Sequence, residues 1–271
     1  MEVKIKQDAY GSIVVNGIPI PYIEIPLLSF HLKKIDVSIS ISSSSRKPHT
    51  DILENTALFC TSSKNYLQNF IRKLSDIFDI HITWSIIKPG DLPDLAVISA
   101  ILTASLSSLH SYFNEQIELE EMLEIVEAVN NDLGIPRWWS RVIEASILSS
   151  HAIKPTIYRH KHDYIIIDDI PIQIEVTMPQ AKLCIEMPPM KTPRGETNVD
   201  IRTSIARMYS TVMTESIIGK SFGIKELNKV DHFVMDYLYE LPCQPTSKDC
   251  KFIPSAPFTF QQICLRKEVK T

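Results

Sequence analysis

Glycine is scarce in this sequence, with seven glycines among 271 residues. Loops that bind phosphate through backbone N–H groups depend on glycine, because it lets the backbone approach the ligand closely. The low count therefore leaves few places for such a loop. It does not argue against a folded protein, since 44% of the residues are hydrophobic and 22% are charged, as in ordinary globular domains.

The chain also lacks an excess of positive charge. Its 28 lysine and arginine residues are outnumbered by 32 aspartate and glutamate residues, which gives a net charge of −4 and a pI near 6.1. Proteins that bind DNA or RNA usually present clustered positive charge to the phosphate backbone. The composition therefore argues against a nucleic-acid partner.

Charged side chains are missing from Leu95 to Phe113, a run of apolar and small residues. A helix that is apolar on nearly every side is predicted to be surrounded by other elements. The run is long enough to cross a membrane, but a span would bury its many hydroxyl groups in lipid. We therefore expect a core helix and no membrane partner. The interrupting polar residues are Ser99, Thr103, Ser105, Ser107, Ser108 and His110.

Cysteines with a recognisable spacing are absent. The cysteines are odd in number, are widely spread and form no Cys-x-x-Cys motif; they are Cys60, Cys184, Cys243, Cys250 and Cys264. This usage predicts reduced thiols in a cytoplasmic protein, and the lack of a charged-then-apolar leader fits that location. A Cys243–Cys250 disulfide is the alternative if the source is a thermophile, as the isoleucine-rich composition hints.

A strand, a loop and the buried helix follow one another from Ile82 to Phe113. The run Ile82–Ile87 is typical of a strand, and Lys88–Asp94 forms the loop. In this order a helix N-terminus can present N–H groups to a phosphate when the loop is rich in glycine. This loop has one glycine, two prolines without an N–H and two aspartates that repel phosphate. The candidate phosphate-loop residues are Lys88, Gly90, Asp91 and Asp94.

The remaining chain alternates between strand-rich and helix-rich regions. Residues 1–42 read as strands, with a turn at Gly11 and a hairpin signal at Asn16–Gly17. Residue spacing predicts helices within 51–78, 118–131, 137–149, 201–212 and 227–238, and strands within 156–176 and 251–267. This order predicts an α+β chain with two lobes, residues 1–155 and 156–271.

A tryptophan pair has two interpretations. Trp138 and Trp139 lie beside Arg137 and Arg141. Tryptophan next to arginine can stack a nucleobase, but such residues more often pack in a core.

Three histidines also have two interpretations. His160 and His162 on one strand would project to the same side and could join His151 on a metal. An exposed hairpin turn is the favoured interpretation, because no further ligand has a recognisable spacing. We therefore expect no metal site.

Four segments resemble motifs of the GHMP kinases, a family that includes mevalonate, phosphomevalonate and homoserine kinases and diphosphomevalonate decarboxylases. Ala9–Gly17 is similar to the family's opening strand, Ala-Pro-Gly-Ser-Ile-x-Leu-x-Gly. Pro89–Ala96 sits where the family places the phosphate loop, Pro-x-x-x-Gly-Leu-Gly-Ser-Ser-Ala. Gly134–Pro136 is similar to the Gly-x-Pro before the catalytic aspartate, and Pro254–Phe258 resembles a late glycine-rich loop without its glycines.

The resemblance implies a two-lobed GHMP-kinase-like fold, with a ribosomal-protein-S5-domain-2-like N-terminal lobe and a ferredoxin-like C-terminal lobe. It also implies that Ser140 stands near the place of the catalytic aspartate. Phosphoryl transfer needs N–H groups aimed at the phosphates and carboxylates that hold magnesium. Because these features are missing, we expect a non-catalytic binding or partner subunit that needs no cofactor.

A divergent ATP-dependent kinase or decarboxylase of the mevalonate-pathway type is the alternative. ATP and Mg²⁺ would then be its cofactors. Lys88 or Arg141 would pair with phosphate, and Asp91 or Asp94 would hold magnesium. The candidate catalytic residues are Ser12, Ser140 and Arg141.

The sequence leaves the partner open. A small molecule and a protein are both compatible with it, and a homodimer can form through an exposed strand edge or through the helix Arg137–Ser149. An α+β protein of another family, with accidental motif matches, is a third interpretation.

Overall fold

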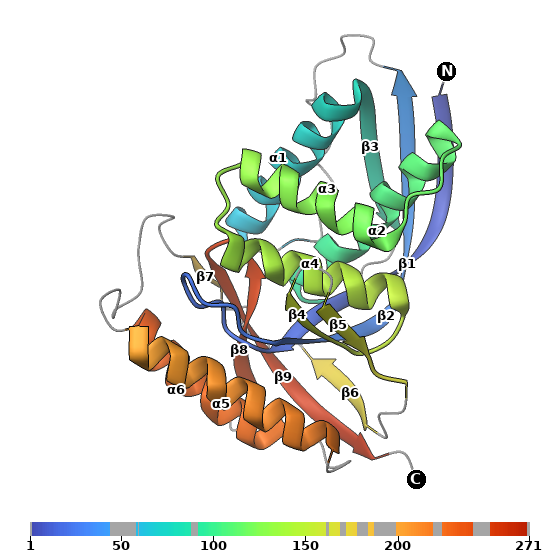
Figure 1. Cartoon of the computed structure of the whole chain (residues 1–271). Helices are drawn as coiled ribbons and strands as arrows, with labels where there is room; N and C mark the ends of the chain where they lie inside the picture. The colour runs from blue at the N-terminus through green and yellow to red at the C-terminus, as the bar shows by residue number, and fades with distance from the viewer. Residues whose placement is uncertain are drawn as a thin grey trace.

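A computed structural model describes residues 2–43, 58, 60–87, 92–160, 163–168, 172–177, 184–186, 199–218, 224–240 and 250–269. Helices and strands alternate in blocks, which confirms the expected α+β class (Figure 1). In chain order the elements are β1 (Glu2–Asn16), β2 (Leu27–Ser43), α1 (Thr61–Phe78), β3 (Ile80–Ile87), α2 (Asp94–Phe113), α3 (Leu119–Asp132), α4 (Arg137–Ala152), β4 (Thr156–His160), β5 (Asp163–Ile166), β6 (Ile172–Thr177), β7 (Cys184–Glu186), α5 (Val199–Ile218), α6 (Ile224–Tyr239), β8 (Cys250–Ala256) and β9 (Thr259–Val269).

Strand β2 organises a five-stranded sheet. One edge of β2 pairs antiparallel with β1, and the other edge pairs with β4 near Leu28 and with β3 from Asp36 onward. Strand β5 pairs with β4. Alternate residues of β2 are buried between Ile35 and Ile41, because successive side chains of a strand point to opposite faces. This confirms the predicted strand and directs its isoleucines into the core.

Helix α2 lies at the centre of the helical layer that covers this sheet (Figure 1). It packs on β1, β2, α1, α4 and β8, and every residue from Asp94 to Leu106 is buried. Of the helices that the structure describes, α2 is the one long and apolar enough to cross a membrane, and 78% of its most apolar window is buried inside the protein. The core helix expected from the uncharged run is confirmed.

Strand β9 organises a second, four-stranded sheet. It pairs with β8 through a tight turn at Pro257 and Phe258, and with β6 and β7 on its other edge. Helices α5 and α6 pack side by side next to this sheet (Figure 1).

Two expectations for the N-terminal strands are wrong. The chain does not turn at Gly11, since β1 continues through it with a register shift between Tyr10 and Ser12. Gly11 instead lets β1 approach α2, because a Cβ there would lie 3.0 Å from the Cβ of Ala96. Asn16–Gly17 does not form a tight hairpin either, since β2 begins only at Leu27. Residues 17–26 form the β1–β2 loop.

The expected boundary between the lobes, at residue 155, stays a prediction. Strands β4 and β5 follow that boundary but pair within the first sheet, because β4 bonds to β2. Strand β6 is the first strand of the second sheet along the chain. The pairing therefore favours a boundary between β5 and β6.

The buried carboxylate of Asp231 in α6 joins the end of β1 to the C-terminal elements. It accepts hydrogen bonds from the side-chain amide of Asn16 at 3.0 Å and from the backbone N–H of Gly17 at 3.2 Å. It also accepts one from the hydroxyl of Tyr209 in α5 and forms an ion pair with Lys251 in β8. Four donors from β1, α5, β8 and the β1–β2 loop therefore satisfy one carboxylate.

The ammonium group of Lys251 is equally well satisfied. Besides Asp231, it donates to the carbonyl oxygen of Val15 and, at 2.9 Å, to the side chain of Asn228. Burial lowers the pKa of Lys251, and the Asp231 carboxylate opposes that shift. Burial, reinforced by Asp231, raises the pKa of Tyr209, so its hydroxyl keeps the proton that it donates.

Side chains from both lobes also anchor the β1–β2 loop. The N–H of Ile18 donates to the Tyr209 hydroxyl oxygen at 3.3 Å, and the carbonyl oxygen of Pro19 accepts from Tyr239. Farther along, the carbonyl oxygen of Ile25 accepts from Arg141 at 3.0 Å. The loop is therefore a fixed part of the fold.

Gly17 supplies the first test. Its φ is +107°, and a Cβ there would lie 2.7 Å from Leu27 Cδ2 and 2.9 Å from the Pro26 carbonyl oxygen. We expect Gly17→Ala to lower the free energy of unfolding by roughly 2–4 kcal/mol, through backbone strain and overpacking, in urea titrations. Gly134 is the matched control: its φ is +71°, but no atom lies within 4 Å of the place that a Cβ would occupy there. Gly134→Ala should cost about 1 kcal/mol, and equal losses at both sites would contradict the argument.

Candidate functional site

The N-terminus of α2 is the place where the sequence predicted a phosphate loop. Of the candidate loop residues, Lys88, Gly90 and Asp91 lie outside the described part of the chain. The fourth, Asp94, is the first residue of α2 and is fully buried. Pro93 precedes it in extended conformation and has no N–H to offer a ligand.

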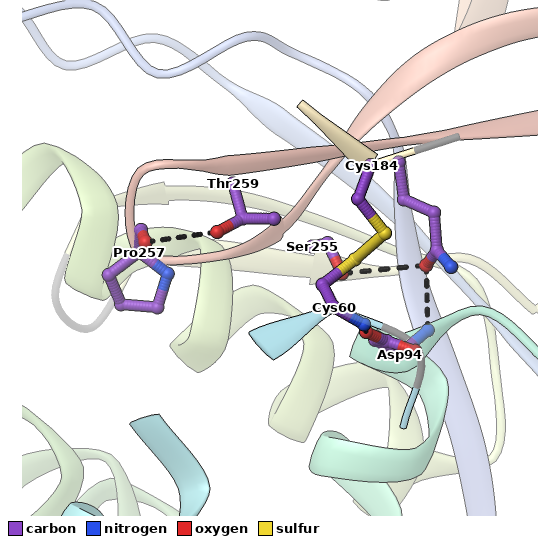
Figure 2. Close-up of a disulfide and its surroundings, with 7 residues drawn as sticks. Cys60, Asp94, Cys184, Ser255, Pro257 and Thr259 are labelled. Carbon is purple, nitrogen blue, oxygen red and sulfur yellow. Dashed lines mark hydrogen bonds between the residues drawn. A yellow bond between two sulfur atoms is a disulfide. The ribbon is translucent and has the colours of Figure 1, made fainter. Parts of the chain in front are cut away.

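Asp94 is held on two sides by other elements (Figure 2). Its carboxylate oxygen Oδ2 accepts a hydrogen bond from the backbone N–H of Cys60 at 2.9 Å. Its own N–H donates to the side-chain oxygen of Gln261 in β9 at 2.8 Å. A carboxylate in the first turn of a helix interacts favourably with the helix dipole. The protein's own negative charge therefore lies where a phosphate-binding helix would hold its ligand.

A disulfide closes this arrangement. Cys60, the residue before α1, is bonded to Cys184 in β7, with their Cα atoms 6.0 Å apart (Figure 2). Cys184 in turn lies opposite Gln261 in the β7–β9 pairing. Cys60, Cys184, Gln261 and Asp94 thus form a closed ring of contacts, which we call the α2 seal. Its members come from the start of α1, β7, β9 and α2.

The expectation of reduced thiols is wrong for four of the five cysteines. Besides Cys60–Cys184, the structure pairs Cys250 with Cys264, which lie opposite each other in β8 and β9. The alternative Cys243–Cys250 disulfide is also wrong, because Cys250 is already bonded. Cys243 lies outside the described residues. Both disulfides depend on strand pairing, which cysteine spacing does not reveal.

Ser12, a candidate catalytic residue, joins β1 to its neighbours. It is fully buried, and its hydroxyl donates to the carbonyl oxygen of Phe30 in β2 at 2.9 Å. Its N–H donates to the hydroxyl oxygen of Ser99 in α2 at 2.8 Å, and that hydroxyl lies 3.1 Å from the Ser12 carbonyl oxygen. These bonds hold strand and helix together and leave the hydroxyl away from solvent.

Ser140 belongs to a buried network around Glu144 in α4. Its hydroxyl donates to the Glu144 carboxylate at 2.7 Å and accepts from the side-chain amide of Asn130 at 2.9 Å. The same carboxylate accepts from the Tyr158 hydroxyl at 2.5 Å and pairs with Arg137. Burial and the nearby Glu144 raise the pKa of Tyr158. Glu144, one helical turn beyond Ser140, therefore serves as the shared acceptor that holds these buried side chains together.

Arg141 binds backbone instead of a ligand. Its guanidinium donates to the carbonyl oxygens of Ile25 and Arg159 and lies 5.6 Å from the ring centre of Tyr158. The side chain is 2% exposed, and this burial lowers its pKa. Arg141 therefore ties α4 to β4 and to the β1–β2 loop.

A hollow of about 420 Å³ opens between α3 and α4. Ser140 and Arg137 line it from α4, and two acidic residues of α3 line the opposite side. Arg137 already contacts both Glu127, at 3.5 Å, and Glu144. The remaining lining residues are Glu124, Ala128, Asn131 and Ile135.

The two neighbouring tryptophans have different surroundings. Trp139 is buried, with its ring centre 5.7 Å from that of Phe258 and 5.2 Å from that of Phe260, so it packs α4 against the β8–β9 hairpin. Trp138 is half-buried, and its ring centre lies 5.1 Å from that of the exposed Tyr22. The packing interpretation therefore holds for Trp139.

The structure describes only part of the histidine set. His151 is exposed near the end of α4, and His160 ends β4, while His162 lies outside the described residues. Within the described ranges, no group of three or more histidine, cysteine, aspartate or glutamate side chains is placed to hold a metal.

Several solved structures share this arrangement of elements. The mevalonate kinase of L. major, solved with R-mevalonate, aligns with 97% of this chain and 88% of its own, at 9% identity and a TM-score of 0.58. The Methanococcus jannaschii mevalonate kinase aligns over 98% of this chain and 90% of its own, at 10% identity and a TM-score of 0.53. The Cytophaga hutchinsonii homoserine kinase aligns over 96% of this chain and 84% of its own, at 13% identity and a TM-score of 0.52. No family model and no curated protein sequence matches the chain.

The chain has the GHMP-kinase fold. Identities near 10% show the shared fold and no more than that. Within this fold, the α2 seal lies at the segment that the motif resemblance aligned with the phosphate loop. The β8–β9 hairpin, which the resemblance aligned with a glycine-rich loop, supplies Gln261 to the seal.

Sequence reasoning missed three residues that shape the contacts described above: Cys60, Gln261 and Glu144. The contacts of Cys60 and Gln261 with Asp94 span 34 and 167 residues, and no local pattern signals such pairs. Glu144 had a usable signal, because it lies within the run Val142–Leu148, where apolar residues predominate, and a glutamate buried there requires a partner.

Asp94 supplies the second test. Asp94→Ala removes the acceptor of a buried N–H, so we expect the free energy of unfolding of the oxidised protein to fall by roughly 2–3 kcal/mol in urea titrations. Asp200 is the matched control, because it is also an acidic residue in a first helical turn but is exposed. Asp200→Ala should change stability by less than about 0.5 kcal/mol. Similar losses of unfolding free energy for both variants would show that the buried contacts of Asp94 do not stabilise the protein.

Proposed function

We propose that this chain is a GHMP-kinase-like protein that does not transfer phosphoryl groups and acts as a binding or partner subunit. The observation that carries the proposal is the buried Asp94 carboxylate at the N-terminus of α2, bonded to Cys60 and facing the end of the helix dipole. A nucleotide phosphate at this position would meet like charge in a buried site, which is strongly unfavourable.

The surroundings of α4 support the same proposal. Ser140 donates its hydroxyl to Glu144, and Arg141 is bound to backbone carbonyl groups. Trp139 packs against Phe258 and Phe260, so aromatic side chains fill the contact between α4 and the β8–β9 hairpin. The residues at these positions hold the packing together. Among those described, the carboxylate of Glu144 lies beside a serine hydroxyl that is already hydrogen-bonded to it.

A partner subunit needs a surface for its partner. Helix α4 is buried from Trp139 to Ser150, so most of it is unavailable for a homodimer. In the described sheet, β1 pairs with no strand other than β2, but the N–H of Ser12 and the carbonyl oxygens of Tyr10 and Val15 are already bonded to side chains of α2, α4 and β8, so a further strand would have to pair with β1 before Tyr10. Of the two routes to a homodimer, this favours the strand edge. The partner and the cytoplasmic location stay predictions.

Nucleotide binding to the oxidised protein is the deciding test. A ligand that binds only the folded state at a concentration of 100 Kd stabilises it by about 2.7 kcal/mol. An active kinase with a micromolar Kd should thus gain several degrees in melting temperature in 1 mM ATP with Mg²⁺. We expect no change here, either with ATP and Mg²⁺ or with ATP alone.

The opposite result has a clear meaning. A saturable, magnesium-dependent rise in melting temperature, together with ATP turnover on a small-molecule acceptor, would overturn the proposal. It would favour the divergent ATP-dependent kinase or decarboxylase, with ATP and Mg²⁺ as cofactors.

A further inference from the structure

Strand β5 forms one end of the first sheet. It pairs with β4, and among the residues that the structure describes no other strand pairs with it (Figure 1). The N–H of Ile167 donates to the carbonyl oxygen of Pro155 at 2.9 Å, so Ile165, two residues earlier, also directs its backbone groups toward β4. The backbone N–H and C=O groups of Tyr164 and Ile166 therefore point away from β4, toward the open edge.

Exposed isoleucines distinguish this edge from the edge at the other end of the sheet. Ile165 is 40% exposed and Ile166 is 37% exposed, on opposite faces of the strand. The open part of β1, before Tyr10, instead presents the charged side chains of Lys4 and Lys6. Charged side chains hinder the pairing of an edge strand with another chain, whereas exposed apolar side chains favour it. Of these two edges, the edge of β5 is better suited to a protein partner.

The sequence of β5 is complementary to itself in an antiparallel register centred on Ile165. In that register Tyr164 lies opposite Ile166 of a second copy, and each such pair exchanges two backbone hydrogen bonds. Ile165 lies opposite Ile165 of the second copy on the other face. Pairs of an aromatic and a β-branched residue, or of two β-branched residues, stabilise neighbouring strands. Both the backbone groups and the side chains of this edge thus fit a copy of themselves.

The charges beside β5 fit the same register. Asp163, whose own partner Arg159 lies at 3.9 Å, would face Ile167 of the second copy. Next to Ile167 lies Asp168, which forms an exposed ion pair with Lys154. No carboxylate stands directly opposite another, an arrangement that would be destabilising. Instead, Asp163 of one copy comes to the side on which the other copy carries the ammonium group of Lys154.

We propose that the open edge of β5 is the interface at which two copies of this chain form a two-fold dimer. The inference rests on the proposed function, because it names a second copy as the partner of this binding or partner subunit. The first sheets of the two copies then join into one continuous sheet across the axis. Because each copy uses the same edge, the interface closes on itself and the assembly stops at a dimer.

Sedimentation velocity of the oxidised full chain tests this interface. Two short strand edges bury little area, so we expect a weak dimer with a Kd of about 10–100 µM. The wild-type protein should therefore change from monomer to dimer as its concentration rises through that range. Ile165→Lys should stay monomeric, because the register brings two like charges together at the axis. Ile77→Lys is the control: Ile77 is 47% exposed but lies in α1, so this variant should dimerise like the wild type.

Opposite charges test the register itself. Ile165→Glu should also be monomeric alone, and mixing it with Ile165→Lys should restore a one-to-one dimer, because residue 165 faces its own counterpart. If a charged variant does not fold, hydrogen exchange of the wild type decides instead. The outward amides of Tyr164 and Ile166 should exchange more slowly at high than at low protein concentration, while β1 before Tyr10 is unchanged.

Three results would overturn the interface. They are a wild-type protein that stays monomeric at about 100 µM, a dimer that survives in Ile165→Lys, and concentration-dependent protection on β1 in place of β5. Failure of the proposed function is a separate result, because it would appear as binding and turnover of ATP. A dimer that turns over ATP would contradict the proposed function and leave the β5 interface standing.

Discussion

The carboxylate of Asp231 is the interaction on which the arrangement of the two sheets depends. Burying a charge is costly unless partners surround it, and here the end of β1, α5 and β8 each supply a donor. Removing one partner would leave a charge without compensation inside the protein. Each of these elements is therefore fixed by the others. The fixed β1–β2 loop and the left-handed conformation of Gly17 follow from this arrangement.

The α2 seal follows the same physical rule at the N-terminus of the central helix. A helix that begins inside a protein leaves N–H groups that need acceptors, and an enzyme can leave them for a substrate. This chain provides an acceptor of its own for the first N–H of α2, in Gln261, and the Asp94 carboxylate accepts the N–H of Cys60, the residue before α1. An open site keeps some polar groups unsatisfied until a ligand arrives, whereas the seal satisfies the N–H groups of Asp94 and Cys60 in the folded state. The GHMP-kinase fold is thus combined here with polar partners that the chain itself supplies at this helix end.

The sequence predicted what local patterns determine. The strand pattern of residues 1–42 located β2, the uncharged run located α2, and residue spacing located α3, whose first turn is closed by a bond from the Glu118 N–H to Glu121. Pro93 and the two aspartates of the loop led to the prediction that the phosphate chemistry is altered. These signals act over a few residues, so a pattern can reveal them.

The sequence could not predict contacts that join distant segments. Whether Cys60 meets Cys184 depends on the register of β7 against β9, and whether Lys251 meets Asp231 depends on how α6 packs on β1. Gly11 was read as a turn because its role, a close approach to Ala96, exists only after α2 is in place. Such features arise from tertiary packing, which residue spacing does not encode.

The partners of the first strand are made near the end of synthesis. Asn16 and Asp231 are separated by 215 residues, and Val15 and Lys251 by 236. A ribosome adds residues in order, and N-terminal parts of a chain generally fold first. In this protein the polar groups at the end of β1 stay hydrated until α6 and β8 have been synthesised. The nascent chain therefore stays incomplete at its beginning, and a chain cut short before Asp231 would lack the polar partners of both Asn16 and Val15 at the end of its first strand.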